Sequence, residues 1–110
     1  MEIVRGAIVV MAARGAYTSK PRPAVVVQAN PFNPTHSSVT VCPITSECED
    51  APLFRVTLPP GGRSGLSVTS QVMIDKVVSI PREAIGRQIG VCDPVYSEAI
   101  DEALRVWLAL

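Results

Sequence analysis

The sequence predicts a small, mainly β domain followed by one C-terminal helix. Short segments rich in β-branched residues recur over the first 92 residues, and turn-forming residues separate them. The apolar spacing typical of a helix appears only after residue 93. Strands without helices between them favour an antiparallel sheet that curls over a buried face, as in a small barrel or sandwich. A length of 110 residues, of which 47% are hydrophobic, fits a single domain spanning 1–110.

Six segments have the composition of strands: 6–13, 24–29, 37–46, 53–58, 66–80 and 84–92. The end of the chain, DPVYSEAIDEALRVWLAL, differs because Asp93 can cap a helix and Pro94 suits its first position. Apolar residues there recur at helical spacing, namely Ile100, Ala103, Leu104, Trp107 and Leu108. We therefore expect an amphipathic helix that packs on the sheet or on a partner.

Charge is balanced overall but unevenly distributed. Ten Lys and Arg residues match ten Asp and Glu residues, so net charge alone predicts neither nucleic-acid nor membrane binding. The first 46 residues carry four basic side chains against one acidic, whereas residues 93–110 carry one basic against four acidic. A neutral total can therefore include a basic face suited to an anion.

The cysteines indicate neither a disulfide framework nor a zinc site. Cys42, Cys48 and Cys92 are odd in number and lack C-x-x-C spacing, which favours buried thiols in a reducing cytoplasm. The N-terminal apolar patch is too short for a membrane span and reads as a strand. The acidic cluster ECED, at 47–50, lacks a second cluster, so we expect a solvated turn and no metal site.

The stretch KPRPAVVVQAN holds two cations at the start of an apolar strand. Pro21 and Pro23 fix their own φ and push the residues before them into extended conformations. Side chains alternate along an extended segment, so Lys20 and Arg22 project from one face. Such a pair suits a phosphate, because little side-chain freedom is lost on binding. The alternative is a solvated turn before the strand, an explanation that is more adequate for Lys20 than for Arg22.

A second stretch, TVCPITS, places hydroxyl groups at the end of a strand. Pro43 cannot donate a backbone hydrogen bond, so the chain must leave regular pairing or bulge there. Thr45 and Ser46 follow, where a hydroxyl group can point into a cleft. The competing interpretation is a Ser/Thr turn.

Taken together, these motifs resemble the MazF/PemK (Kid) family of bacterial type II toxins. The resemblance spans the chain, through RGAIVV, KPRPAVVVQ, VTVCPITS, FRVTLPP with its Gly-rich loop, VMIDKVVSIPREAIGRQIGVCD and IDEALRVWLAL. It implies an SH3-like barrel with a C-terminal helix, and a homodimer with an RNA groove across its interface. It also implies a cytoplasmic protein, a MazE-like antitoxin whose C-terminal segment covers the groove, and operator DNA association through that antitoxin.

The resemblance assigns roles to individual residues. Arg22 matches the family's catalytic arginine and Thr45 its catalytic threonine. The implied reaction is sequence-selective cleavage of single-stranded mRNA, in which a ribose 2′-hydroxyl attacks the adjacent phosphate without a metal or cofactor. It leaves a 2′,3′-cyclic phosphate and a 5′-hydroxyl. The residues expected to bind RNA are Tyr17, Lys20, Ser46, Gln71 and Lys76.

Some features depart from the family pattern. Ala7 stands where an acidic residue is common, Lys76 stands where many relatives have glutamine, and the 11–20 loop is short. Tyr17 can stack on a base or pack on the barrel. The single histidine, His36, is a minor candidate for proton transfer and otherwise a loop residue.

Two other functions share the predicted fold. A CcdB-like toxin, which binds DNA gyrase through its helix tip and cuts nothing, is the main alternative to a nuclease. A plain SH3-like module is the weaker one, because the chain has few aromatic residues to line a groove for proline-rich ligands.

Overall fold

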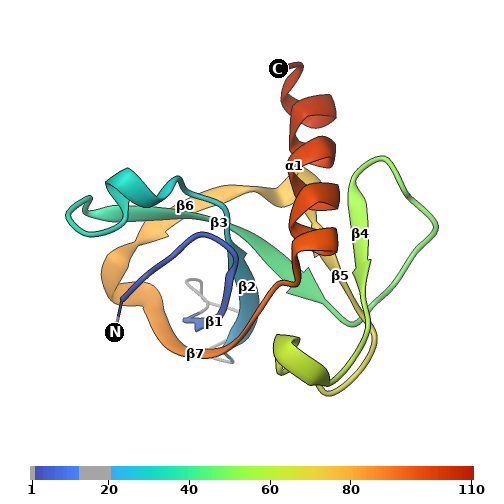
Figure 1. The fold of residues 1–110 in the computed structure, drawn as a ribbon, viewed down its shortest axis with the longest axis horizontal. Helices are drawn as coiled ribbons and strands as arrows, with labels where there is room; N and C mark the ends of the chain where they lie inside the picture. Colours follow the sequence, from blue (N-terminus) through green and yellow to red (C-terminus); the bar gives the residue numbers. More distant parts are fainter. Residues whose placement is uncertain (1, 13–20) are drawn as a thin grey trace.

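The computed structural model describes residues 2–12 and 21–110. This part of the chain forms antiparallel strands followed by one α-helix (Figure 1). The elements are β1 (Ala7–Met11), β2 (Arg22–Val26), β3 (Ser38–Thr45), β4 (Arg55–Leu58), β5 (Ser70–Met73), β6 (Val78–Pro81), β7 (Ile85–Val91) and α1 (Pro94–Leu108). The strand order is β4-β5-β3-β2-β1-β7, and β6 also pairs with β3. The predicted mainly β class with a C-terminal helix is confirmed.

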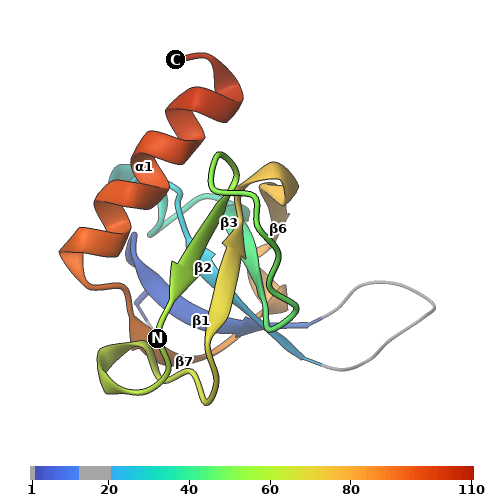
Figure 2. The same cartoon turned by 90° about the vertical axis from the view of Figure 1, so that its right-hand side faces the viewer.

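The long strand β3 organises the sheet, which curls strongly around it (Figures 1 and 2). One edge of β3 pairs with β2, while the other pairs first with β6, at Ser38–Val41, and then with β5, at Ile44 and Thr45. Pro43 lies where the neighbour changes. The expected disturbance at Pro43 is therefore a change of partner within a continuous strand that ends at Thr45, as predicted.

The central strands are buried on both faces, which explains their nearly uninterrupted apolar sequence. Val25 faces the larger core with Ile8, Cys42 and the helix, whereas Ala24 and Val26 face a second core under the N-terminal segment. The second core consists of Ile3, Ala7, Val9, Ala24, Val26, Val39 and Val41.

The predicted strand 66–80 is wrong as a single element. It forms β5 and β6, separated by the 3₁₀ turn Ile74–Lys76. The break is required because β5 and β6 pair with different halves of the same edge of β3. The unbroken β-branched composition concealed this turn, and the charged pair Asp75 and Lys76 was its only local signal.

The helix α1 begins as predicted and packs only in part. Pro94 occupies its first turn, but the carboxylate of Asp93 lies 3.2 Å from Arg63 and does not cap the described first turn. Ile100, Ala103 and Leu104 join the larger core, whereas Trp107 and Leu108 are about half exposed. No helix in the described ranges 2–12 and 21–110 is long and apolar enough to cross a membrane.

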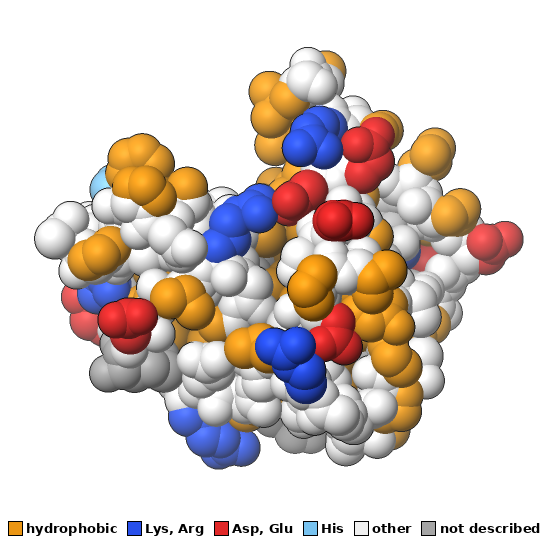
Figure 3. Space-filling view, viewed as in Figure 1, with side chains coloured by type: hydrophobic (Ala, Val, Ile, Leu, Met, Phe, Trp, Pro, Cys, Tyr) orange, Lys and Arg blue, Asp and Glu red, His pale blue; other side chains and the backbone are white. Residues whose placement is uncertain are grey.

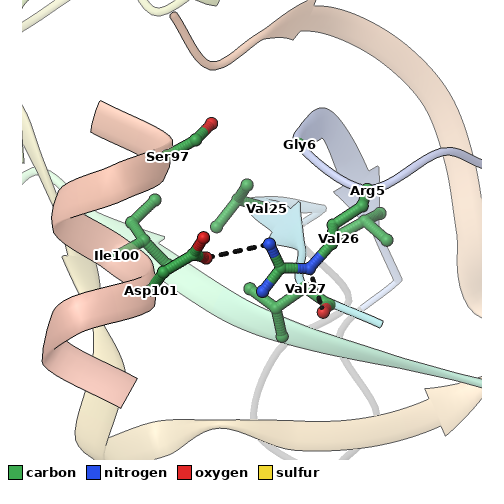
Figure 4. A pocket seen from close by; sticks show the side chains of 8 residues that line it. All are labelled: Arg5, Gly6, Val25, Val26, Val27, Ser97, Ile100 and Asp101. Carbon is green, nitrogen blue, oxygen red and sulfur yellow. Dashed lines mark hydrogen bonds and ion pairs between the residues drawn. The ribbon is translucent and has the colours of Figure 1, made fainter. Parts of the chain in front are cut away.

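An ion pair attaches the helix to the N-terminal segment. Arg5 lies 2.8 Å from Asp101 and donates through Nε to the carbonyl oxygen of Val27 at 2.8 Å (Figure 4). These side chains line a small pocket of about 150 Å³, and the ion pair joins two of its lining residues (Figure 4). The pocket therefore belongs to the attachment of α1, and its walls are otherwise mostly aliphatic.

The cysteines are free, and two of the three are buried. Cys42 and Cys92 lie in the larger core, as predicted, but Cys48 is exposed in the loop after β3, where the burial prediction is wrong. Burial raises the pKa of Cys42 from 9.0 to about 12 against the opposing charge of Arg5. Burial, assisted by Asp93, raises that of Cys92 to about 11.

These thiols should make the protein less stable in alkali. The folded protein keeps protons that the unfolded chain releases above pH 9.0, so stability falls as pH rises toward 11. Each buried thiol should lower the free energy of unfolding by about 1.4 kcal/mol per pH unit in this window. Urea unfolding at several pH values measures the slope. Cys92→Ala should reduce it and Cys48→Ala should not, and an unchanged slope in Cys92→Ala would contradict this origin.

Candidate active-site groove

A groove of about 440 Å³ lies at one end of the curled sheet. Its walls come from the start of β2, the end of β3 and the segment before β5. The lining residues are Pro21, Arg22, Pro23, Ile44, Thr45, Ser46, Glu47, Leu66, Ser67, Val68 and Ser70. Three of the residues predicted to act in function, Arg22, Thr45 and Ser46, thus share one groove.

The sheet register explains why Arg22 and Thr45 meet. In the β2–β3 pair Val25 is opposite Cys42 and Ala24 is opposite Pro43. Continuing this antiparallel register by two residues sets Arg22 across from Thr45. Directly opposite residues have Cβ atoms about 5 Å apart and project from the same face. A cation and a hydroxyl group from two distant parts of the sequence are therefore neighbours.

Arg22 is exposed at the start of β2 and is available to an anion. Within the described part of the chain it has no ion-pair partner, whereas Arg5, Arg55, Arg63 and Arg105 each lie within 4.0 Å of a carboxylate. Pro21 and Pro23, on either side of it, also line the groove. A guanidinium group held in this way can bind two phosphate oxygens with its planar fork.

Thr45 combines the two interpretations that the sequence left open. Its Oγ1 accepts a hydrogen bond from the backbone N–H of Glu47 at 3.1 Å, which is a Ser/Thr turn. The hydroxyl group keeps its own proton, which it can donate to a ligand in the groove. Ser46, the next residue, is exposed and adds a second hydroxyl group.

Gln71 and Lys76, two further residues predicted to bind RNA, are not in the described groove lining. Gln71 is only 7% exposed, and its side-chain amide makes hydrogen bonds within the protein. Lys76 is exposed at the end of the 3₁₀ turn. Lys20 and Tyr17 lie outside the described residues, so their predicted RNA contacts stay predictions.

His36 lies in the loop before β3, outside the groove lining. Its Nδ1 accepts a hydrogen bond from the backbone N–H of Ser38 at 3.2 Å, and its carbonyl oxygen accepts one from Arg82 at 3.0 Å. The loop interpretation of this histidine therefore fits its contacts.

Sequence reasoning missed one wall of the groove. Leu66, Ser67 and Val68 come from the loop that follows the glycine-rich turn, and Glu47, in the loop after β3, also lines the groove. The only signal for the wall was the polar run SVTS between two apolar segments. Among the described residues, no group of three or more His, Cys, Asp and Glu side chains gathers as a metal site would need.

Charge and hydrophobicity on the helix face differ from those of the groove. On the face shown in Figure 3, acidic side chains gather over α1 together with basic and exposed hydrophobic ones. The exposed hydrophobic residues of the helix and C-terminus are Val95, Val106, Trp107, Leu108 and Leu110. The acidic charge of the C-terminal segment therefore lies on the helix and not in the groove lining.

Comparison with known proteins identifies the family. Residues 4–108 match the model for the PemK-like, MazF-like toxin of type II toxin–antitoxin systems. A probable endoribonuclease MazF from Mycolicibacterium smegmatis is 43% identical over 106 residues, which are 96% of each chain. Endoribonuclease MazF9 from Mycobacterium tuberculosis is 33% identical and covers 89% of this chain and 86% of its own.

Solved structures agree with this assignment. The M. tuberculosis toxin MazF-mt6 superposes with a TM-score of 0.80 at 27% identity, covering 94% of this chain and 97% of its own. A MazE–MazF structure from Deinococcus radiodurans has the same fold, with a TM-score of 0.84 at 23% identity over 100% and 99% of the two chains. The chain therefore belongs to the MazF/PemK family of type II toxin–antitoxin toxins and is a homologue of the MazF endoribonucleases.

Proposed function

We propose that this chain is a toxin that cleaves single-stranded mRNA in the groove lined by the start of β2, the end of β3 and the segment before β5. One observation carries the proposal: Arg22 and Thr45, from the ends of two paired strands, line the same groove. The two relatives described above carry the name endoribonuclease, which supports this chemistry. RNA supplies the phosphate that a proline-flanked arginine, with no ion-pair partner among the described residues, is suited to bind.

In the proposed reaction a ribose 2′-hydroxyl attacks the adjacent phosphorus. The bond from phosphorus to the 5′-oxygen breaks, which leaves a 2′,3′-cyclic phosphate and a 5′-hydroxyl. Negative charge gathers on the non-bridging oxygens in the transition state, where the guanidinium group of Arg22 stabilises it. The Thr45 hydroxyl donates a further hydrogen bond, because its oxygen is already oriented by Glu47. A guanidinium group has donors only and no acceptor, so the proposed role of Arg22 is charge stabilisation.

The same groove is the proposed target of the antitoxin. Related toxins have been solved in complex with a cognate antitoxin, including MazE–MazF from D. radiodurans. We propose that a MazE-like antitoxin folds its C-terminal segment over Arg22 and Thr45 and blocks them. The proposal includes a toxin homodimer, and operator DNA association through the antitoxin.

Cleavage of a long RNA tests the function directly. Purified, antitoxin-free protein should cut single-stranded RNA at discrete sites in EDTA, leaving cyclic-phosphate ends. Primer extension maps the sites and thereby the recognised sequence. Thr45→Ala should slow cutting by about a hundredfold, as expected at the lower end for loss of one neutral hydrogen-bond donor to a developing charge. Intact RNA from the folded protein would contradict the proposal and favour the gyrase-binding alternative, which a gyrase supercoiling assay checks.

A further inference from the structure

We propose that Arg55 and Gln71 are positioning residues that hold the Thr45 hydroxyl in its reactive orientation. We call this pair the Arg55–Gln71 bracket. The inference rests on the proposed function of Thr45 and gives Gln71 a role other than direct RNA contact. Neither side chain lines the groove, so the bracket acts through the backbone of the loop that follows β3.

The sheet positions Gln71, and the hydrogen-bonding groups of its side-chain amide are all used within the protein. It lies on β5, in register with Thr45 on one side and Thr57 on the other. Its Oε1 accepts from the backbone N–H of Glu49 at 3.0 Å and from Arg55 at 3.3 Å. Its Nε2 donates to the carbonyl oxygen of Glu49 at 3.0 Å and to Oγ1 of Thr57 at 3.2 Å. All four hydrogen-bonding positions of the amide are therefore occupied within the protein.

Arg55 extends the bracket toward the groove. Its side chain is only 11% exposed, and Nη1 donates both to Gln71 and, at 3.2 Å, to the carbonyl oxygen of Glu47. Nη2 lies 3.5 Å from the Glu49 carboxylate. The buried Nε has no hydrogen-bond partner among the described residues, which costs stability. A contribution to stability alone therefore does not explain why an arginine stands at position 55. The hydrogen bond from its Nη1 to the carbonyl oxygen of Glu47 does explain it.

The backbone of the loop after β3 connects the Arg55–Gln71 bracket to the Thr45 hydroxyl. Arg55 fixes the peptide group after Glu47, and Gln71 fixes the two peptide groups on either side of Glu49. The N–H of Glu47 then points at Oγ1 of Thr45 at 3.1 Å. That bond occupies one lone pair of the hydroxyl oxygen and restricts where its proton can point. Without the bracket the exposed loop would be free to rotate, and the hydroxyl would lose its fixed direction.

Gln71→Leu tests the bracket, with Gln88→Leu as a matched control on the exposed surface of β7. We expect Gln71→Leu to lower kcat for a short RNA by about tenfold to a hundredfold, with little change in KM, because a small misplacement weakens transition-state contacts. Arg55→Lys should retain much of the kcat that Arg55→Leu loses. A lysine ammonium group can still reach either the carbonyl oxygen of Glu47 or Oε1 of Gln71, the two oxygens that Arg55 Nη1 contacts. Should Gln71→Leu fail to fold, Thr57→Val removes one acceptor and should shift kcat in the same direction.

Two measurements separate positioning from a general loss of structure. The first is a double-mutant cycle, in which Gln71→Leu should have no further effect on kcat in a Thr45→Ala background. A full additional loss there would overturn action through Thr45. The second is amide hydrogen exchange at Glu47 without RNA, which should speed up in Gln71→Leu. Unchanged exchange would overturn the bracket even if the enzyme cleaves, whereas intact RNA with wild-type protein would overturn the proposed function instead.

Discussion

Replacing Arg22 with alanine is expected to lower the single-turnover rate of RNA cleavage by about a thousandfold. The reason is that Arg22 is the one positively charged residue among those lining the described groove. Loss of a donor that faces a developing charge usually costs a factor of about a hundred to a thousand, and the guanidinium also carries formal charge. The measurement is cleavage of a fluorogenic oligonucleotide containing a mapped site, with enzyme in excess.

The matched controls make this expectation specific. Arg105 is exposed on α1, outside the groove lining, and pairs only with Glu102 among the described residues, so Arg105→Ala should cleave at the wild-type rate. Arg22→Lys keeps the charge but loses the planar fork, so it should recover only part of the rate. Because Arg22 is exposed, Arg22→Ala should change stability by no more than about 0.5 kcal/mol. A folded Arg22→Ala protein with the wild-type rate would refute the role of Arg22.

The central part of the groove could be predicted from the sequence because local chemistry marks it. Prolines on both sides of Arg22 restrict the backbone, and Pro43 marks the point, just before Thr45, where β3 changes from pairing with β6 to pairing with β5. These signals act over a few residues, so the sequence alone reveals them. The family resemblance then connected the two motifs, which lie more than 20 residues apart.

The remaining features depend on contacts between distant segments. The split between β5 and β6 follows from which half of β3 each one pairs with, and no propensity of the residues 66–80 encodes that choice. Gln71 was expected to bind RNA from the family resemblance, but it is buried on β5 and its amide bonds to the loop after β3. Exposure of Cys48 likewise follows from the course of that loop. Residue type alone cannot show which neighbours occupy a side chain.

A second large effect is expected from Gly90→Ala, which should lower the free energy of unfolding by about 3 kcal/mol. Gly90 lies on β7, where the 3₁₀ turn Gly62–Ser64 packs directly against the strand backbone. A Cβ atom at Gly90 would overlap the carbonyl oxygens of Arg63 and Ser64. Backbone atoms cannot move aside as a flexible side chain can, so the turn would have to separate from β7. Urea unfolding measures the loss, which is a large part of the 5–15 kcal/mol typical of a domain.

Gly62→Ala is the control that separates this overlap from backbone strain. Gly62 has φ +58°, but a Cβ atom there would meet no other atom within 4 Å. It should therefore cost only the left-handed penalty of about 1 kcal/mol. The same turn leads into Leu66 and Val68, so Gly90→Ala should also displace the far wall of the groove and slow RNA cleavage. Equal stability losses in Gly90→Ala and Gly62→Ala would contradict the prediction. The contact between the turn Gly62–Ser64 and β7 would then be dispensable for stability and could not be what holds Leu66 and Val68 in the groove wall.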